Sequence, residues 1–192
     1  EISKTMNDAL NLGAPNDAGY DYILDFEKRF EIKARNPVTT GWQQVDSICR
    51  GGLGAGELGV CIAPTGAGKS MALVHLGAQA ILEGKTVVHY TLELADTVVA
   101  TRYDSCITGI PVTNVFSNKE KVFDTIQDIE GQLIVKEYPT KSASTKTINA
   151  HLDRLSRRGI DIGMVIVDYG DLLRPISVQR EKRNELESIY EE

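Results

Sequence analysis

The sequence lacks the features that mark membrane, secreted and metal-stapled proteins. No apolar run approaches the roughly 20 residues that cross a bilayer, and no basic stretch leads into an apolar one near the first residue, so neither a membrane span nor a signal peptide is expected. The three cysteines, Cys49, Cys61 and Cys106, are an odd number without a CxxC pair. This pattern excludes a zinc ribbon and a disulfide framework. It fits a reducing compartment, so we expect a cytoplasmic protein that contacts no membrane.

Positive charge is also in the minority. The 192 residues include 21 Lys plus Arg against 27 Asp plus Glu, a net charge of −6, which disfavours a protein that coats duplex DNA by bulk charge. A local basic loop on an acidic body is still compatible with this balance. With 42% hydrophobic and 25% charged residues, the composition is typical of a globular protein with one main domain.

Apolar segments alternate with amphipathic ones along most of the chain. The apolar runs are short and apolar throughout, as in strands that are buried on both faces. We therefore predict the α/β class, with a mainly parallel sheet covered by helices on both faces. The expected strands are 58–63, 86–92, 133–137 and 164–167, and the expected helices are 69–82, 95–107, 119–129, 145–157 and a last one from Asn184.

The first 36 residues are set apart from this body. Glycine, proline and asparagine punctuate residues 1–19, and residues 20–34 then carry an apolar stripe at helical spacing. We predict an N-terminal arm and linker helix over 1–36 and a compact domain over 37–192. The apolar stripe needs a surface to cover it, so we expect the helix to tether neighbouring subunits. Because the chain stops inside a helical pattern, we expect the domain to be truncated on its C-terminal side.

The strongest motif is a glycine-rich turn between an expected strand and an expected helix. Gly66 and Gly68 allow the backbone to wrap so that successive N–H groups point at phosphate oxygens, and the helix that follows directs its positive end at the same anion. Lys69 can reach the outer phosphates, and the Ser70 hydroxyl can ligate Mg²⁺. The alternative is a turn that binds nothing, which the strand–turn–helix context disfavours. The predicted nucleotide-binding residues are Ala63, Pro64, Thr65, Gly66, Ala67, Gly68, Lys69 and Ser70.

Two carboxylates follow other expected strands. Asp168 ends the apolar run MVIVD, where an open α/β sheet places ligand-contacting residues, and is predicted to hold Mg²⁺ together with Ser70. The position after it, where many P-loop ATPases carry a glutamate, is Tyr169. We therefore predict that Glu93, after the next strand, polarises the attacking water, with Lys69 as its catalytic partner. The alternatives are an Asp that caps a turn and a solvated Glu that favours a helix start.

These motifs together resemble the motor domain of the DnaB-type hexameric replicative helicases, bacterial or phage. The segment 39–58 resembles the family's Thr-Gly-aromatic start with a later Asp and a glycine run, and alanine at the first P-loop position, here Ala63, is familiar in it. Residues 89–105 resemble its strand that ends in Ser-Leu-Glu-Met. Residues 165–173 resemble its Asp-Tyr-Leu-x-Leu stretch, and 183–192 its following charged helix. The departures are a leucine in place of the Met and a glycine in place of the first Leu.

The resemblance implies a RecA-like P-loop core over 37–192 that binds and hydrolyses ATP with Mg²⁺ and couples hydrolysis to translocation on single-stranded DNA. It also implies a ring hexamer, and a primase or helicase loader as a further partner. The arginine finger and a second DNA loop would lie beyond Glu192, so the chain alone is expected to be poorly active. Lys69 and Glu93 are implied to be catalytic.

The resemblance further implies a DNA-contacting loop after the Asp168 strand. The stretch from Arg174 to Arg183 is locally basic, and Arg174, Arg180, Lys182 and Arg183 are the candidate contacts. The alternative is a solvated surface loop. Two other functions stay open from the sequence: a KaiC-like or recombinase-like ATPase of the same fold, and a nucleotide-binding module without motor activity.

Overall fold

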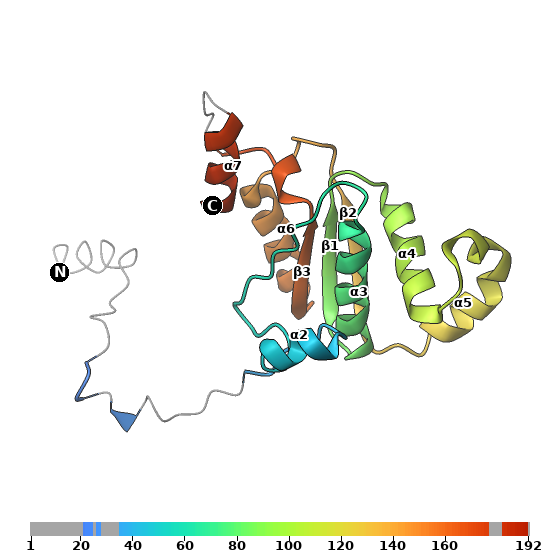
Figure 1. The fold of residues 1–192 in the computed structure, drawn as a ribbon, viewed down its shortest axis with the longest axis horizontal. Helices are drawn as coiled ribbons and strands as arrows, with labels where there is room; N and C mark the ends of the chain where they lie inside the picture. Colours follow the sequence, from blue (N-terminus) through green and yellow to red (C-terminus); the bar gives the residue numbers. More distant parts are fainter. Residues whose placement is uncertain (1–20, 25, 28–34, 177–181, 192) are drawn as a thin grey trace, which may run out of the picture. The chain divides into compact units, whose positions relative to one another are not determined.

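The computed structural model describes residues 21–24, 26–27, 35–176 and 182–191. The chain divides into two units, Glu1–Arg35 and Asn36–Glu192. The second unit contains these elements, shown in Figure 1: α2 (Gln43–Ile48), α3 (Lys69–Leu82), β1 (Thr86–Thr91), α4 (Asp96–Thr108), η2 (Val112–Asn114), η3 (Phe116–Asn118), α5 (Lys119–Ile126), β2 (Gln132–Glu137), α6 (Thr145–Arg157), β3 (Ile162–Asp168), η4 (Gly170–Leu172) and α7 (Lys182–Glu191).

The first unit is described only in part. Its residues 21–24 form a turn in which the Asp21 carboxylate accepts hydrogen bonds from the backbone N–H groups of Ile23 and Leu24, at 2.9 and 2.7 Å. Most of the helix predicted over 20–34 lies outside the described residues. The tether therefore stays a prediction.

The sheet of the second unit has three parallel strands in the order β2-β1-β3. The central strand β1 pairs with both neighbours, so that Thr91 lies opposite Glu137 on one side and Asp168 on the other. All three strands therefore end at one edge of the sheet, the edge at which open α/β proteins bind ligands. The predicted parallel sheet is confirmed.

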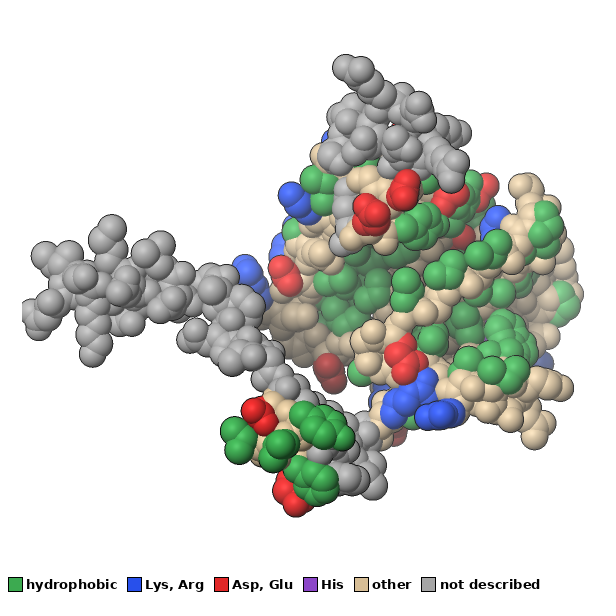
Figure 2. Space-filling model, turned by 60° about the vertical axis from the view of Figure 1, so that its left-hand side comes forward, with side chains coloured by type: hydrophobic (Ala, Val, Ile, Leu, Met, Phe, Trp, Pro, Cys, Tyr) green, Lys and Arg blue, Asp and Glu red, His purple; other side chains and the backbone are tan. Residues whose placement is uncertain are grey.

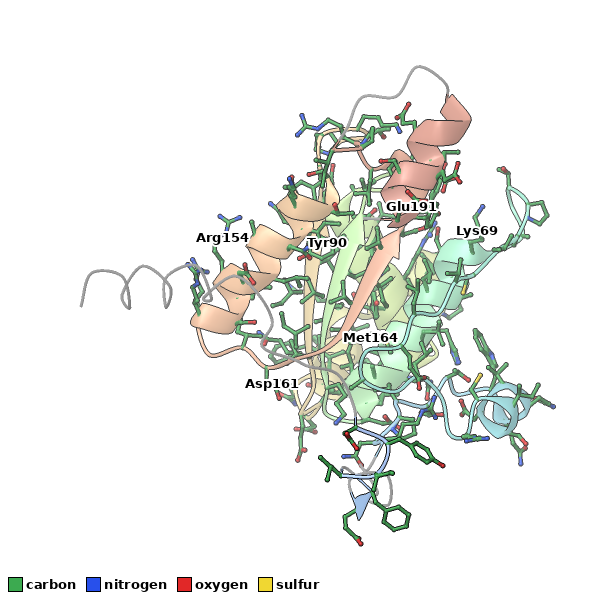
Figure 3. The ribbon with its side chains drawn as sticks, turned by 90° about the vertical axis from the view of Figure 1, so that its left-hand side faces the viewer. Lys69, Tyr90, Arg154, Asp161, Met164 and Glu191 are labelled. Carbon is green, nitrogen blue, oxygen red and sulfur yellow. The ribbon has the colours of Figure 1, made fainter. Side chains whose placement is uncertain are left out.

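Helices cover both faces of this sheet. Figure 3 shows the sheet between α3, which begins at Lys69, and α6, which carries Arg154. Alternate residues of β1 serve the two faces, since Val87 packs with the α3 and α4 side chains whereas Val88 and Tyr90 pack with those of α6. In the part of the chain that the structure describes, no helix has both the length and the apolar character to span a membrane.

The helix ends explain why several boundaries were predictable. Gly84, predicted as a C-cap glycine, adopts a φ of +77° just past α3, and the N–H groups of Gly84 and Lys85 donate to the carbonyls of Ile81 and Ala80. At the start of α6, the Ser144 hydroxyl accepts from the Thr147 N–H and the Thr147 hydroxyl accepts from the Ser144 N–H. Both caps are encoded within a few residues of sequence.

The segment that leads into the body contains a short helix that the sequence analysis missed. The Asp46 carboxylate of α2 accepts hydrogen bonds from the Thr40 N–H at 2.8 Å, from the Thr40 hydroxyl at 2.7 Å and from the Thr39 hydroxyl. Trp42 stacks on His75 of α3 with ring centroids 4.6 Å apart. The Thr-Thr-Gly-Trp…Asp pattern thus serves to fold this segment and anchor it on α3.

The strand predicted over 58–63 is wrong. The chain there has no regular secondary structure, and Leu58 and Ile62 are 83% and 91% exposed. A strand needs a ladder partner, but β1 already pairs on both sides, and no described residue pairs with this segment. The outer neighbour of β1 on this side, β3, leaves Val165 42% exposed. Figure 2 shows such hydrophobic side chains at the surface of the second unit.

A buried histidine makes the stability of the fold depend on pH. His89 of β1 is fully buried, and its Nδ1 lies 2.9 Å from the Tyr103 hydroxyl. Burial lowers the pKa of His89 to about 4, and the charge of Asp168 opposes this shift only in part. The unfolded chain, with an ordinary histidine pKa near 6.5, therefore binds the proton first as the pH falls.

We expect His89 to cost the fold about 2 kcal/mol of unfolding free energy between pH 7 and pH 5, because its folded-state pKa is depressed. The contribution is complete above the unfolded pKa and is lost as the pH falls toward the folded pKa. Urea unfolding of the wild type and of His89→Gln at both pH values measures it as the difference between their pH dependences. Equal pH dependences in the two proteins would contradict the expectation.

Candidate nucleotide-binding and catalytic site

The P-loop backbone takes the shape that anion binding requires. Gly66 and Gly68 have φ values of +80° and +93°, a region that only glycine adopts readily, and neither has a neighbour within 4 Å of the position a Cβ would take. Backbone conformation, not space, therefore demands glycine at both positions. Gly68 is also the N-cap of α3, and no side chain caps this helix start. The first N–H groups of α3 thus have no side-chain acceptor and are available to an anion.

Lys69 connects this turn to the end of β3. Its Nζ donates to the Ala63 carbonyl at 3.0 Å and lies 5.4 Å from the centroid of the Tyr169 ring. The ammonium group therefore lies across the mouth of the turn, beside the residue that follows Asp168. Figure 3 shows Lys69 at the opposite end of the molecule from Asp161, which precedes β3. The P-loop and the carboxyl end of β3 are thus brought together, as predicted from the sequence.

Asp168 is a buried carboxylate without a hydrogen-bond donor. It is 1% exposed, and neither Oδ1 nor Oδ2 has a partner among the described residues. A buried charge of this kind is costly unless a cation or donors compensate it. His89, whose low pKa leaves it neutral at pH 7, does not supply that charge. The orphaned oxygens of Asp168 therefore fit a role in holding Mg²⁺.

The described residues contain no cluster of three or more His, Cys, Asp and Glu side chains that could hold a metal ion by themselves. This agrees with the coordination habits of Mg²⁺, which keeps several waters and uses one or two protein oxygens together with substrate phosphates. Ser70 lies in the first turn of α3, and its side chain is half-buried. Asp168 and Ser70 would contribute the protein oxygens, with the phosphates and waters completing the set.

Glu93 lies two residues beyond the end of β1, on an exposed turn. The backbone N–H of Leu92 donates to the Asp168 carbonyl at 2.9 Å, so that the ladder continues to the residue before Glu93. Glu93 therefore lies at the same sheet edge as Asp168, as the sequence analysis predicted.

The sequence analysis missed the residue that shapes this turn. Thr91 is fully buried, and its hydroxyl donates to the Leu94 carbonyl at 2.8 Å and accepts from the Leu94 N–H at 3.1 Å. This bracket fixes the backbone on both sides of Glu93. The available signal was a threonine at a strand end followed by a turn, in which a hydroxyl commonly bonds nearby backbone.

The candidate DNA-contacting residues are only partly described. The Arg174 side chain is exposed, and its backbone N–H donates to the Ala143 carbonyl at 2.7 Å. Arg180 lies outside the described residues. Lys182 and Arg183 form the first turn of α7, which begins two residues before the predicted start at Asn184, and their side chains are not described. The basic stretch therefore includes the start of a helix.

The fold and this site define a P-loop NTPase of the RecA-like class. The sequence model of the family described as the DnaB-like helicase C terminal domain matches residues 37–192. The chain therefore belongs to the DnaB-like helicase C-terminal domain family.

A relative and a solved structure agree with this assignment. The chain is 28% identical over 180 residues to the DnaB-like replicative helicase of Enterobacteria phage T4, covering 88% of this chain and 38% of that protein. It thus spans well under half the length of that relative. Among solved structures, another ATPase domain matches with a TM-score of 0.63 and 13% sequence identity, over 100% of this chain and 64% of that one. This last likeness supports the fold.

Proposed function

We propose that this chain is the ATP-binding and ATP-hydrolysing motor domain of a replicative DNA helicase, which couples hydrolysis to translocation on single-stranded DNA. The observation that carries the proposal is the buried Asp168 carboxylate, which has no donor among the described residues and lies at the strand end beside the P-loop lysine. A turn that binds nothing has no need of this arrangement. Family membership supports the same conclusion.

Each residue of the site has a distinct role in this proposal. The P-loop amides and Lys69 bind the phosphates of ATP, and Ser70 and Asp168 hold Mg²⁺, which neutralises charge as the terminal phosphoryl group departs. Glu93 orients and polarises the attacking water, held in place by the Thr91 bracket. We propose the domain limits 1–36 and 37–192 for the arm and the motor.

The proposed partners are single-stranded DNA, further copies of this chain in a ring hexamer, and a primase or helicase loader. The T4 relative is described as a replicative helicase, which supports the first of these. The amphipathic stretch within the first 36 residues is proposed to tether neighbouring subunits.

The test of the motor proposal is the effect of single-stranded DNA on ATP turnover. In the whole protein, we expect single-stranded DNA to raise the rate of ATP hydrolysis, whereas duplex DNA of the same length should raise it less. A protein that binds ATP and hydrolyses it at a rate that DNA does not change would be a nucleotide-binding module without motor activity, and the motor proposal would fail.

The basic stretch after β3 is expected to contact the DNA backbone. Changing Arg180, Lys182 and Arg183 together to Ala in the whole protein should lower the affinity for single-stranded DNA and flatten its salt dependence, because each neutralised phosphate releases counterions. Fluorescence anisotropy at several salt concentrations measures both quantities.

A matched control removes the same charge elsewhere. Lys85, Lys119 and Lys121 are exposed and lie outside the site and outside the basic stretch. Their triple change to Ala should leave the salt slope as in the wild type. If the two triple variants behave alike, the basic stretch makes no specific contact with DNA.

A further inference from the structure

A cavity of about 790 Å³ lies beside the start of α6, away from the P-loop turn and from Asp168. None of the residues that line it is among those assigned to the nucleotide site. Its polar lining consists of Lys141, Ser144, Lys146, Thr147, Arg174 and Glu185.

The walls of this cavity are fixed to each other by the backbone. The Lys141 N–H donates to the Leu172 carbonyl at 2.8 Å, and the Arg174 N–H donates to the Ala143 carbonyl at 2.7 Å. The loop after β2 and the loop after β3 are therefore joined side by side. Ser144 is buried and caps α6, so this wall too is held in place. The cavity is thus a formed site.

The charges in the cavity favour an anion. Three cations, Lys141, Lys146 and Arg174, face one acid, Glu185, on a chain whose net charge is −6. Lys141 pairs with Glu185 at 2.7 Å, whereas Lys146 and Arg174 have no ion pair with any described side chain. The start of α6, a helix of 13 residues, adds the positive end of its dipole.

We propose that this cavity binds a backbone phosphate of single-stranded DNA through Lys141, Lys146 and Arg174, and that Glu185 holds Lys141 until the DNA displaces it. The inference rests on the proposed function and adds two lysines and an acidic competitor to its DNA contacts. Arg174 connects the cavity to the basic stretch that follows it, so one strand could contact both. No aromatic side chain is among the described residues that line the cavity, so binding should show no preference for base sequence.

The charge reversal Lys146→Glu tests the cation side of the proposal. Lys146 is exposed and lies in the first turn of α6, where a carboxylate is favoured by the helix dipole, so the fold should tolerate the change. We expect the affinity of the whole protein for single-stranded DNA to fall about tenfold, and the salt slope to shrink by about 0.7 for the lost phosphate contact. The control is Lys121→Glu, the same change at an exposed lysine of α5.

The change Glu185→Gln tests the acidic competitor and has the opposite sign. It frees Lys141 and removes a repulsive charge, so the affinity for single-stranded DNA should rise about threefold. The lost ion pair is partly exposed, so its loss should cost the fold little. A merely structural role for the pair would lower the affinity.

The proposal requires a fall with Lys146→Glu beyond that of Lys121→Glu and a rise with Glu185→Gln, and any other combination overturns it. A second arm asks whether the site takes nucleotide phosphates instead. ATP is titrated into Lys69→Ala and into Lys69→Ala with Lys146→Glu, and residual binding that only the second variant loses would assign the cavity to nucleotide. If the wild type binds no single-stranded DNA at all, the proposed function itself fails. A wild type that binds DNA with unaffected variants refutes only this site.

Discussion

Replacing Lys69 by alanine is expected to lower the affinity for ATP·Mg²⁺ by about 100-fold or more. Removing a charged partner from a desolvated phosphate contact typically costs about 3 kcal/mol, which corresponds to that factor. Lys69 is the only Lys or Arg in the turn from Ala63 to Ser70, and its Nζ already lies across the mouth of the turn, 3.0 Å from the Ala63 carbonyl. No neighbouring cation of the turn can take over its contact. Isothermal titration calorimetry measures the change.

The matched control is Lys85→Ala. Lys85 is exposed and lies just past the other end of α3, so its removal changes the net charge equally without touching the P-loop. Its affinity for ATP·Mg²⁺ should equal that of the wild type. An unchanged affinity in Lys69→Ala would refute the nucleotide site.

Elements with local end signals were predicted well from the sequence. The helix predicted over 145–157 has those bounds, because Ser144 and Thr147 form a capping box within four residues. The helix over 69–82 also has its predicted bounds, because Gly84 ends it with a left-handed backbone. In both cases the information lies within one turn of the helix end.

Elements whose existence depends on a distant partner were predicted less well. The apolar run 58–63 indicates a buried strand, but an apolar run says nothing about which strand would pair with it. In the structure, β1 is occupied on both sides and the run stays unpaired. The helix Gln43–Ile48 was missed for a related reason, since it depends on the side chains of Thr39 and Thr40 bonding to Asp46.

The candidate site shows the same division. That Asp168 and Glu93 lie at one edge of the sheet follows from the direction of parallel strands, and could be predicted. The Thr91 bracket and the position of Lys69 beside Tyr169 depend on the register of β1 against β3 and on how the loops pack. Register and loop packing have no local signature in the sequence, so these contacts emerged only from the structure.

The position of the general base leads to the other large effect. Glu93→Gln should leave the affinity for ATP·Mg²⁺ as in the wild type and lower turnover about 10²-fold or more in the whole protein, the range expected for loss of a general base. Glutamine keeps the size of the side chain and loses only the charge and basicity. Because Thr91 and Leu94 fix the backbone through their own hydrogen bonds, the turn should keep its shape in the variant.

Steady-state turnover and calorimetry on the same preparation separate catalysis from binding. Glu83→Gln, the same change at an exposed residue just past the far end of α3, is the control and should turn over as the wild type does. Turnover that survives in Glu93→Gln would move the base elsewhere, and Asp171 is the next carboxylate after the β3 strand. The Asp171 carboxylate already accepts a hydrogen bond from the Tyr190 hydroxyl at 2.6 Å, a contact that raises the pKa of Tyr190 to about 12. Since this bond anchors α7, Asp171 would have to give it up to orient a water, and we therefore expect turnover to depend on Glu93.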